Sequence, residues 1–134
     1  MRNFRPMLKL AGMAIACLAA TLPASAQGPE LAMLGGLERG GWELRLRPDG
    51  GTMPICVRNG REFIQLRHRQ PPCDKFVVQD DADTVTVQYT CRGNGYGRTT
   101  IRRENATLVQ VRSQGIQGGM PFSIEGEARK TGSC

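Results

Sequence analysis

The chain has 134 residues, of which 18 are basic and 12 acidic, for a formal net charge of +6. One domain is the default at this length, and 40% hydrophobic residues are enough to build a core. Length and composition therefore exclude a multidomain enzyme, a long coiled coil, a polytopic membrane protein and a wholly disordered chain.

Residues 1–26 have the pattern of a secretory signal peptide. Three basic residues precede an apolar run over 10–22, and Ala24-Ser25-Ala26 supplies the small residues of a cleavage site. The run is too short for a transmembrane anchor, which needs about 20 apolar residues. Lipidation at Cys17 is the weaker alternative, since Ala14 stands where such sites usually have Leu. We predict cleavage after Ala26, a periplasmic or secreted location, and no transmembrane segment in the mature chain.

Cleavage changes the charge and the cysteine count. It removes three basic residues and no acidic one, so the net charge falls from +6 to +3. Four cysteines remain, and an even number in an exported chain predicts two disulfides; they are Cys56, Cys73, Cys91 and Cys134. Three pairings are open. We favour Cys56–Cys73, which flanks one compact segment, and Cys91–Cys134, which ties the last residue to the middle of the chain.

The cysteines do not indicate a metal site or a catalytic thiol. No two of them have C-x-x-C spacing, and His68 is the only histidine in the sequence. Since His68 lies between two arginines, a protonated imidazole is disfavoured there. We predict no metal and no cofactor.

Alternation of apolar and polar residues dominates the mature sequence and predicts half-buried strands. In 42–47 the apolar face is Trp and Leu, and the other face is Glu and Arg. The clearest strand is 84–91, where Cys91 shares the face of Val87 and Tyr89. We expect strands over 42–47, 53–57, 76–79, 84–91, 97–104, 107–114 and 120–129. The last four form an antiparallel meander.

One segment breaks this alternation and predicts a short helix over 60–69. Asn59 is a suitable N-cap, Glu62 completes a capping-box pattern, and Pro71-Pro72 ends the segment. The glycine-rich residues 27–39 are expected to form a loosely ordered N-terminal arm. The fold prediction is thus an all-β domain over 40–134, an antiparallel meander forming a curved sheet or a small barrel, with one short helix and two disulfides.

Two groups of residues are candidate binding sites. A curved sheet can hold a small apolar ligand behind one set of side chains, or the same side chains simply fill the core; these are Trp42, Val87, Tyr89, Val111 and Phe122. Arginines on polar strand faces suit an anionic partner such as an envelope component, or form a solvated face paired with acids; these are Arg45, Arg47, Arg98 and Arg102, here called the arginine face. No nucleic-acid reader motif is present, so no nucleic-acid partner is expected.

Catalytic residues are not indicated. One histidine does not allow a Ser-His-Asp arrangement, and the carboxylate pair that can be named, Glu125 and Glu127, lies on a polar strand face. We therefore assign no catalytic residue and lean towards a non-enzymatic protein. An envelope hydrolase that uses carboxylates is kept as an alternative.

Short motifs at the two ends of the domain suggest a relationship. Gly41-Trp42-Glu43 opens it, the spaced cysteines follow, and Gly132-Ser133-Cys134 ends the chain. Their order over 40–134 resembles a family of small exported proteobacterial domains of unknown function. The resemblance implies an envelope location in the periplasm and a β-rich fold, and it supplies no site residues. We expect an exported binding module for a small apolar ligand or envelope component, or else an accessory protein-interaction domain acting through the arginine face. The sequence does not indicate an oligomeric state.

Overall fold

A computed structural model describes residues 30–69 and 73–134. The predicted signal peptide, its cleavage site and residues 27–29 lie outside this part of the chain. The elements, in order, are α1 (Ala32–Gly35), β1 (Gly40–Leu46), β2 (Thr52–Val57), the 3-10 turn η1 (Arg61–Phe63), β3 (Asp74–Asp80), β4 (Thr84–Cys91), β5 (Gly95–Asn105), β6 (Leu108–Gln117) and β7 (Met120–Gly132). The all-β prediction is confirmed.

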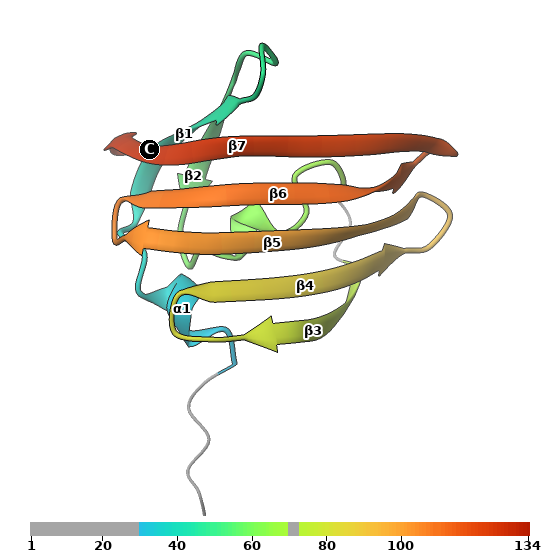
Figure 1. Cartoon of the computed structure of the whole chain (residues 1–134), viewed down its shortest axis with the longest axis horizontal. Helices are drawn as coiled ribbons and strands as arrows, with labels where there is room; N and C mark the ends of the chain where they lie inside the picture. The colour runs from blue at the N-terminus through green and yellow to red at the C-terminus, as the bar shows by residue number, and fades with distance from the viewer. Residues whose placement is uncertain (1–29, 70–72) are drawn as a thin grey trace, which may run out of the picture.

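The strands form one sheet in the order β2-β1-β7-β6-β5-β4-β3, and each neighbouring pair is antiparallel. Strands β3 to β7 are the consecutive hairpins of a meander, as predicted for 84–129. The β1–β2 hairpin joins it at the far side, where β1 pairs with β7. In Figure 1, β1 and β2 pass behind β6 and β7. Because β2 and β3 are both edges, the sheet is open, and of the two expected forms the curved sheet is correct.

The pairing of β1 with β7 depends on two glycines at the start of β1. A Cβ atom at Gly40 would lie 2.4 Å from the carbonyl oxygen of Gly132, and one at Gly41 would lie 2.9 Å from that of Ser133. Gly40 also has a φ of +141°, which L side chains rarely adopt. The Gly-Gly-Trp sequence thus lets the first strand approach the end of the last.

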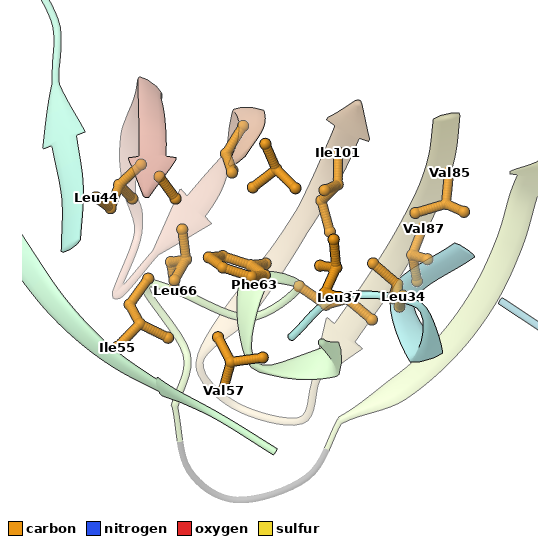
Figure 2. Packing of buried hydrophobic residues seen from close by; sticks show 14 of the residues in the cluster. Leu34, Leu37, Leu44, Ile55, Val57, Phe63, Leu66, Val85, Val87 and Ile101 are labelled. Atoms are coloured by element: carbon orange, nitrogen blue, oxygen red, sulfur yellow. The ribbon is translucent and has the colours of Figure 1, made fainter. Parts of the chain in front are cut away.

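The core lies between the concave face of the sheet and the segment that follows β2. Alternation points every second side chain of β1 and β4–β7 inward, including Leu44, Val87 and Ile101. Figure 2 shows Phe63 at the centre of this cluster, surrounded by side chains from the sheet and from β2. The ring of Phe63 meets Trp42 edge to face, with centroids 5.5 Å apart.

The short helix predicted over 60–69 is present only as the 3-10 turn η1 over 61–63, so it is shorter than expected. The expected capping contact is present: Glu62 Oε1 accepts hydrogen bonds from the backbone N–H groups of Arg58, at 2.9 Å, and Asn59, at 3.4 Å. Downstream, however, the chain buries the side chains of Phe63, Ile64, Leu66 and His68. These positions do not lie on one helical face, so turns replace the helix and bring all four inward.

Residues 30–39 do not form the loosely ordered arm that was expected. They contain α1, and the four side chains buried in the core are Leu31, Met33, Leu34 and Leu37. The backbone is held at both ends, because Leu31 N–H donates to Asp80 Oδ2 and Glu38 N–H donates to the carbonyl of Ala106, each at 2.9 Å. The folded domain therefore begins before residue 40.

The favoured disulfide pairing is also wrong: the bonds are Cys73–Cys91 and Cys56–Cys134. Strand register explains both. Asp74 pairs with Thr90 across β3 and β4, so the preceding Cys73 faces Cys91. Across three strands, Cys56 is opposite Gly41, which is opposite Gly132, so the end of the chain reaches β2.

Candidate functional site

Four of the five residues named as ligand-facing or core are buried in the core, and the fifth, Phe122, is partly buried and also lines a surface hollow of about 410 Å³. Trp42, Val87, Tyr89 and Val111 are at most 2% exposed, and Phe122 packs against their cluster. The Trp42 indole N–H donates to the carbonyl of Glu38 at 2.9 Å, so its polar atom is also engaged. These side chains fill the space behind the sheet, and a ligand site has to be sought at the surface.

The arginine face lies on the outer, convex side of the sheet, and ion pairs engage half of it. Arg45 pairs with Glu43 at 3.5 Å and Arg102 with Glu104 at 3.1 Å. Arg47 donates to Gln110 Oε1 at 2.6 Å. Arg47 and Arg102 line one shallow hollow of about 510 Å³, together with the unpredicted Arg112, whereas Arg98 lies at a different one. The four arginines thus share a face but not a single site.

The carboxylates considered for catalysis are ion-paired on the same face. Glu125 accepts from Arg112 at 3.3 Å, and Glu127 accepts from Arg129 at 2.6 Å and from Gln110 at 2.9 Å. The hydrogen bonds from Gln110 and then Arg129 lower the pKa of Glu127. A general acid at neutral pH needs a raised pKa, so this arrangement does not favour the hydrolase alternative.

A second hollow, which the sequence analysis missed, lies on the other side of the molecule between β2, the η1 segment and the start of β3. Its volume is about 770 Å³, within the usual range for ligand sites. Four cations line it: Arg58, Arg61, Arg69 and Lys75. We call it the basic hollow. Basic residues outnumber acidic ones over 58–75, and this charge run is the pattern that could have revealed it.

The cations of the basic hollow are not neutralised by acidic side chains. In the described chain, no Asp or Glu lies within salt-bridge distance of any of the four. Glu62 also lines the hollow, but its Oε1 accepts from two backbone N–H groups. Its Oε2 is buried without a hydrogen-bond partner among those residues. The hollow is therefore a concentration of positive charge.

Buried contacts hold the wall of the basic hollow to the sheet. Thr99 Oγ1 donates to the carbonyl of Ile64 at 2.7 Å, and Gln65 Nε2 donates to the carbonyl of His68 at 2.8 Å. His68 contacts Tyr89 Oη at 3.0 Å through Nδ1. On the β3 side, the Cys73–Cys91 disulfide fixes the backbone two residues before Lys75. The cations thus project from a rigid frame on flexible side chains.

Comparison with known proteins gives no relative for the chain: no family model, no curated protein and no solved structure matches it. Over 30–69 and 73–134, no helix is long and apolar enough to span a membrane. The same residues hold no group of three or more His, Cys, Asp or Glu side chains arranged to bind a metal ion. Function has to be argued from the surface.

Proposed function

We propose that the protein is an exported, non-enzymatic binding domain whose basic hollow holds a phosphate-bearing anion of the cell envelope. Its two disulfides are consistent with an oxidising compartment, since such bonds are rare in the cytosol. The proposal includes export by the signal peptide, cleavage after Ala26, and a periplasmic location.

One observation supports this proposal above all: four cations line a single hollow, and none of them has an acidic partner among the described residues. Guanidinium groups bind phosphate oxygens in pairs, and an ammonium group adds a compact charge. By contrast, Arg45, Arg102, Arg112 and Arg129 on the outer face each pair with a glutamate. Positive charge free to bind an anion is therefore concentrated in the basic hollow.

The proposal can be tested by titrating the mature, oxidised protein with glycerol phosphate and, separately, with vesicles. One set of vesicles contains phosphatidylglycerol and the other only phosphatidylcholine. We expect saturable binding of glycerol phosphate, with NMR shifts confined to residues around the basic hollow, and preferential binding to the anionic vesicles. Binding to vesicles alone would locate the phosphate on a lipid surface. Binding should weaken steeply with added salt.

A matched pair of variants separates the basic hollow from net charge. Arg58→Gln/Arg61→Gln/Arg69→Gln removes three cations that have no acidic partner among the described residues, although Arg61 donates to the carbonyl of Glu30 at 3.3 Å, and we expect affinity to fall at least tenfold. Arg45→Gln/Arg112→Gln/Arg129→Gln removes the same charge from the outer face, and affinity should change less than twofold. Equal losses in the two variants would show a non-specific charge effect and contradict the proposal, as would an absence of phosphate binding in both titrations.

A further inference from the structure

Besides the hollow lined by Arg47, Arg102 and Arg112, the outer face has another one, and its chemistry differs from that of the basic hollow. It has a volume of about 410 Å³, and its lining includes Tyr96, Arg98, Gln88, Gln114 and Pro121. We call it the tyrosine hollow. Tyr96 is 51% exposed, and Phe76, which lies on the same outer face in β3, is 69% exposed. Two exposed aromatic rings, with Ile116 and Pro121 beside Tyr96, distinguish this end of the outer face.

Three polar side chains cross the tyrosine hollow in one row. Gln88 is opposite Arg98 across β4 and β5, and Arg98 is opposite Gln114 across β5 and β6. Adjacent strands lie about 4.8 Å apart, and residues opposite each other point to the same face, so two amides flank one guanidinium. All three are exposed, and none makes a side-chain hydrogen bond or ion pair in the described chain. The row is therefore free to bind a ligand.

The floor between the row and Tyr96 carries no side chain. Gly97 and Gly115 are directly opposite each other in β5 and β6, and both line the tyrosine hollow. A Cβ atom at Gly115 would lie 2.0 Å from the carbonyl oxygen of Tyr96, and one at Gly97 would lie 2.4 Å from Tyr89 Oη. Larger residues cannot occupy these positions without moving their neighbours. Gly97 is opposite the buried Tyr89, so both glycines are in the inward-facing register and make room for that ring, while the floor of the tyrosine hollow beside Tyr96 is strand backbone.

We propose that the tyrosine hollow binds a pyranose ring that carries a carboxylate, as in a hexuronate unit of an acidic polysaccharide. One face of a pyranose presents C–H groups, which pack on a flat aromatic ring such as Tyr96. Ring hydroxyls both donate and accept, and so do the amides of Gln88 and Gln114. The fork of Arg98 matches a carboxylate in bidentate geometry. A phosphate could accept from the amide N–H groups, but it would leave the amide carbonyl oxygens and the aromatic ring without a matching group.

The test uses the mature, oxidised chain titrated with trigalacturonate, with maltotriose as the neutral trisaccharide. We expect saturable binding of trigalacturonate, with amide shifts at 88, 96, 98 and 114, and at least tenfold weaker binding of maltotriose. Tyr96→Ala and Arg98→Gln should each weaken trigalacturonate binding at least tenfold. Arg102→Gln is the matched control, because Arg102 is on the same strand face but pairs with Glu104.

Several outcomes would overturn this proposal. They are an absence of saturable binding, equal affinity for maltotriose, and displacement of the sugar by glycerol phosphate. Unchanged affinity in both Tyr96→Ala and Arg98→Gln would also overturn it, provided that their spectra show folded protein. The variant Arg58→Gln/Arg61→Gln/Arg69→Gln separates the two sites: it should keep trigalacturonate binding even if the basic hollow binds no phosphate.

Discussion

His68 illustrates how one buried polar residue ties the η1 segment to the sheet. Its Nε2 lies 2.9 Å from the carbonyl oxygen of Asn94, which can only accept, so Nε2 carries the proton. In the neutral ring, Nδ1 then accepts from the hydroxyl of Tyr89 at 3.0 Å. The lone histidine of the sequence is thus engaged on both nitrogens inside the core, which explains its presence without catalysis.

Tyr89→Phe tests this contact at neutral pH. The variant leaves Nδ1 buried without a donor, and we expect a loss of about 1–3 kcal/mol in the free energy of unfolding. Urea unfolding at pH 7 measures it. Tyr96→Phe, at an exposed tyrosine, is the control and should leave the midpoint unchanged. A loss in the control as large as that in Tyr89→Phe would contradict the role given to the buried hydrogen bond.

The same variant has a signature at alkaline pH. Burial raises the pKa of Tyr89 above its ordinary value of 10.0, and a hydrogen bond with Ser113 partly offsets the rise. The unfolded chain therefore ionises first, and stability that is fully present below pH 10 is lost as pH rises towards the folded pKa. Tyr89→Phe lacks this loss, so the difference in the free energy of unfolding between the natural protein and the variant should become smaller above pH 10. A difference that stays constant there would contradict the direction of the shift.

Gln110 sets the titration of Glu127 on the outer face. Its amide is the first cause of the lowered pKa of Glu127, so Gln110→Ala should raise that pKa towards the ordinary value. A lowered folded pKa contributes stability above the ordinary pKa that is lost as pH falls through the folded one. The contribution here is small, because the ion pair is solvated. NMR titration of the carboxyl carbon measures the shift, and Gln114→Ala, on the same strand face, should leave it unchanged.

Among the elements, the positions of the strands could be predicted because one side-chain face of each strand is buried and the other is exposed to solvent. Strand 84–91 appears as β4 with the predicted bounds. The path of the η1 segment was not predictable. Long-range contacts set it, such as the hydrogen bond from Thr99 to the carbonyl of Ile64, and no local pattern encodes them. The basic hollow left a trace in the sequence, the excess of basic residues over 58–75, but only the fold shows that β2, the η1 segment and the start of β3 enclose one hollow.

The disulfide pairing held more information in the sequence than spacing alone revealed. A hairpin that turns at 81–83 brings residue 73 close to residue 91, and the bulge between Val77 and Gln79 sets the register of β3 and β4 that places them opposite each other. The bond from Cys56 to Cys134 was not accessible in this way. It depends on β1 lying between β2 and β7, which is a property of the whole sheet.

The two bonds should differ in what they contribute to stability. In the chain-entropy model, closing the 18-residue separation of Cys73–Cys91 is worth about 3 kcal/mol, and the 78-residue separation of Cys56–Cys134 about 4.5 kcal/mol. We expect the double variant Cys56→Ala/Cys134→Ala to have a lower free energy of unfolding in urea than the double variant Cys73→Ala/Cys91→Ala. Peptide mapping of the oxidised protein checks the pairing itself, and a peptide joining Cys56 to Cys73 would contradict the structure.

At the scale of the whole molecule, the first and last strands of the described domain are neighbours. Strands β3 to β7 pair with their sequence neighbours, so that their contacts are local. The pairing of β1 with β7 closes a loop of most of the domain, which is entropically costly. The meander should therefore form first in folding, and the β1–β2 hairpin should dock onto β7 afterwards.

The Cys56–Cys134 disulfide should change that order, because it holds β2 beside the end of β7 before folding starts. Two matched substitutions test this: Ile55→Val in β2 and Ile101→Val in β5, both at buried positions. In a Cys56→Ala/Cys134→Ala background, Ile101→Val should mainly slow folding, whereas Ile55→Val should mainly speed unfolding, with a φ-value near 0. With the disulfide intact, the φ-value of Ile55→Val should rise while that of Ile101→Val stays the same. Stopped-flow fluorescence of Trp42 gives these rates. An Ile55→Val φ-value that is equal in the two backgrounds would show that the tether does not recruit the hairpin to the transition state.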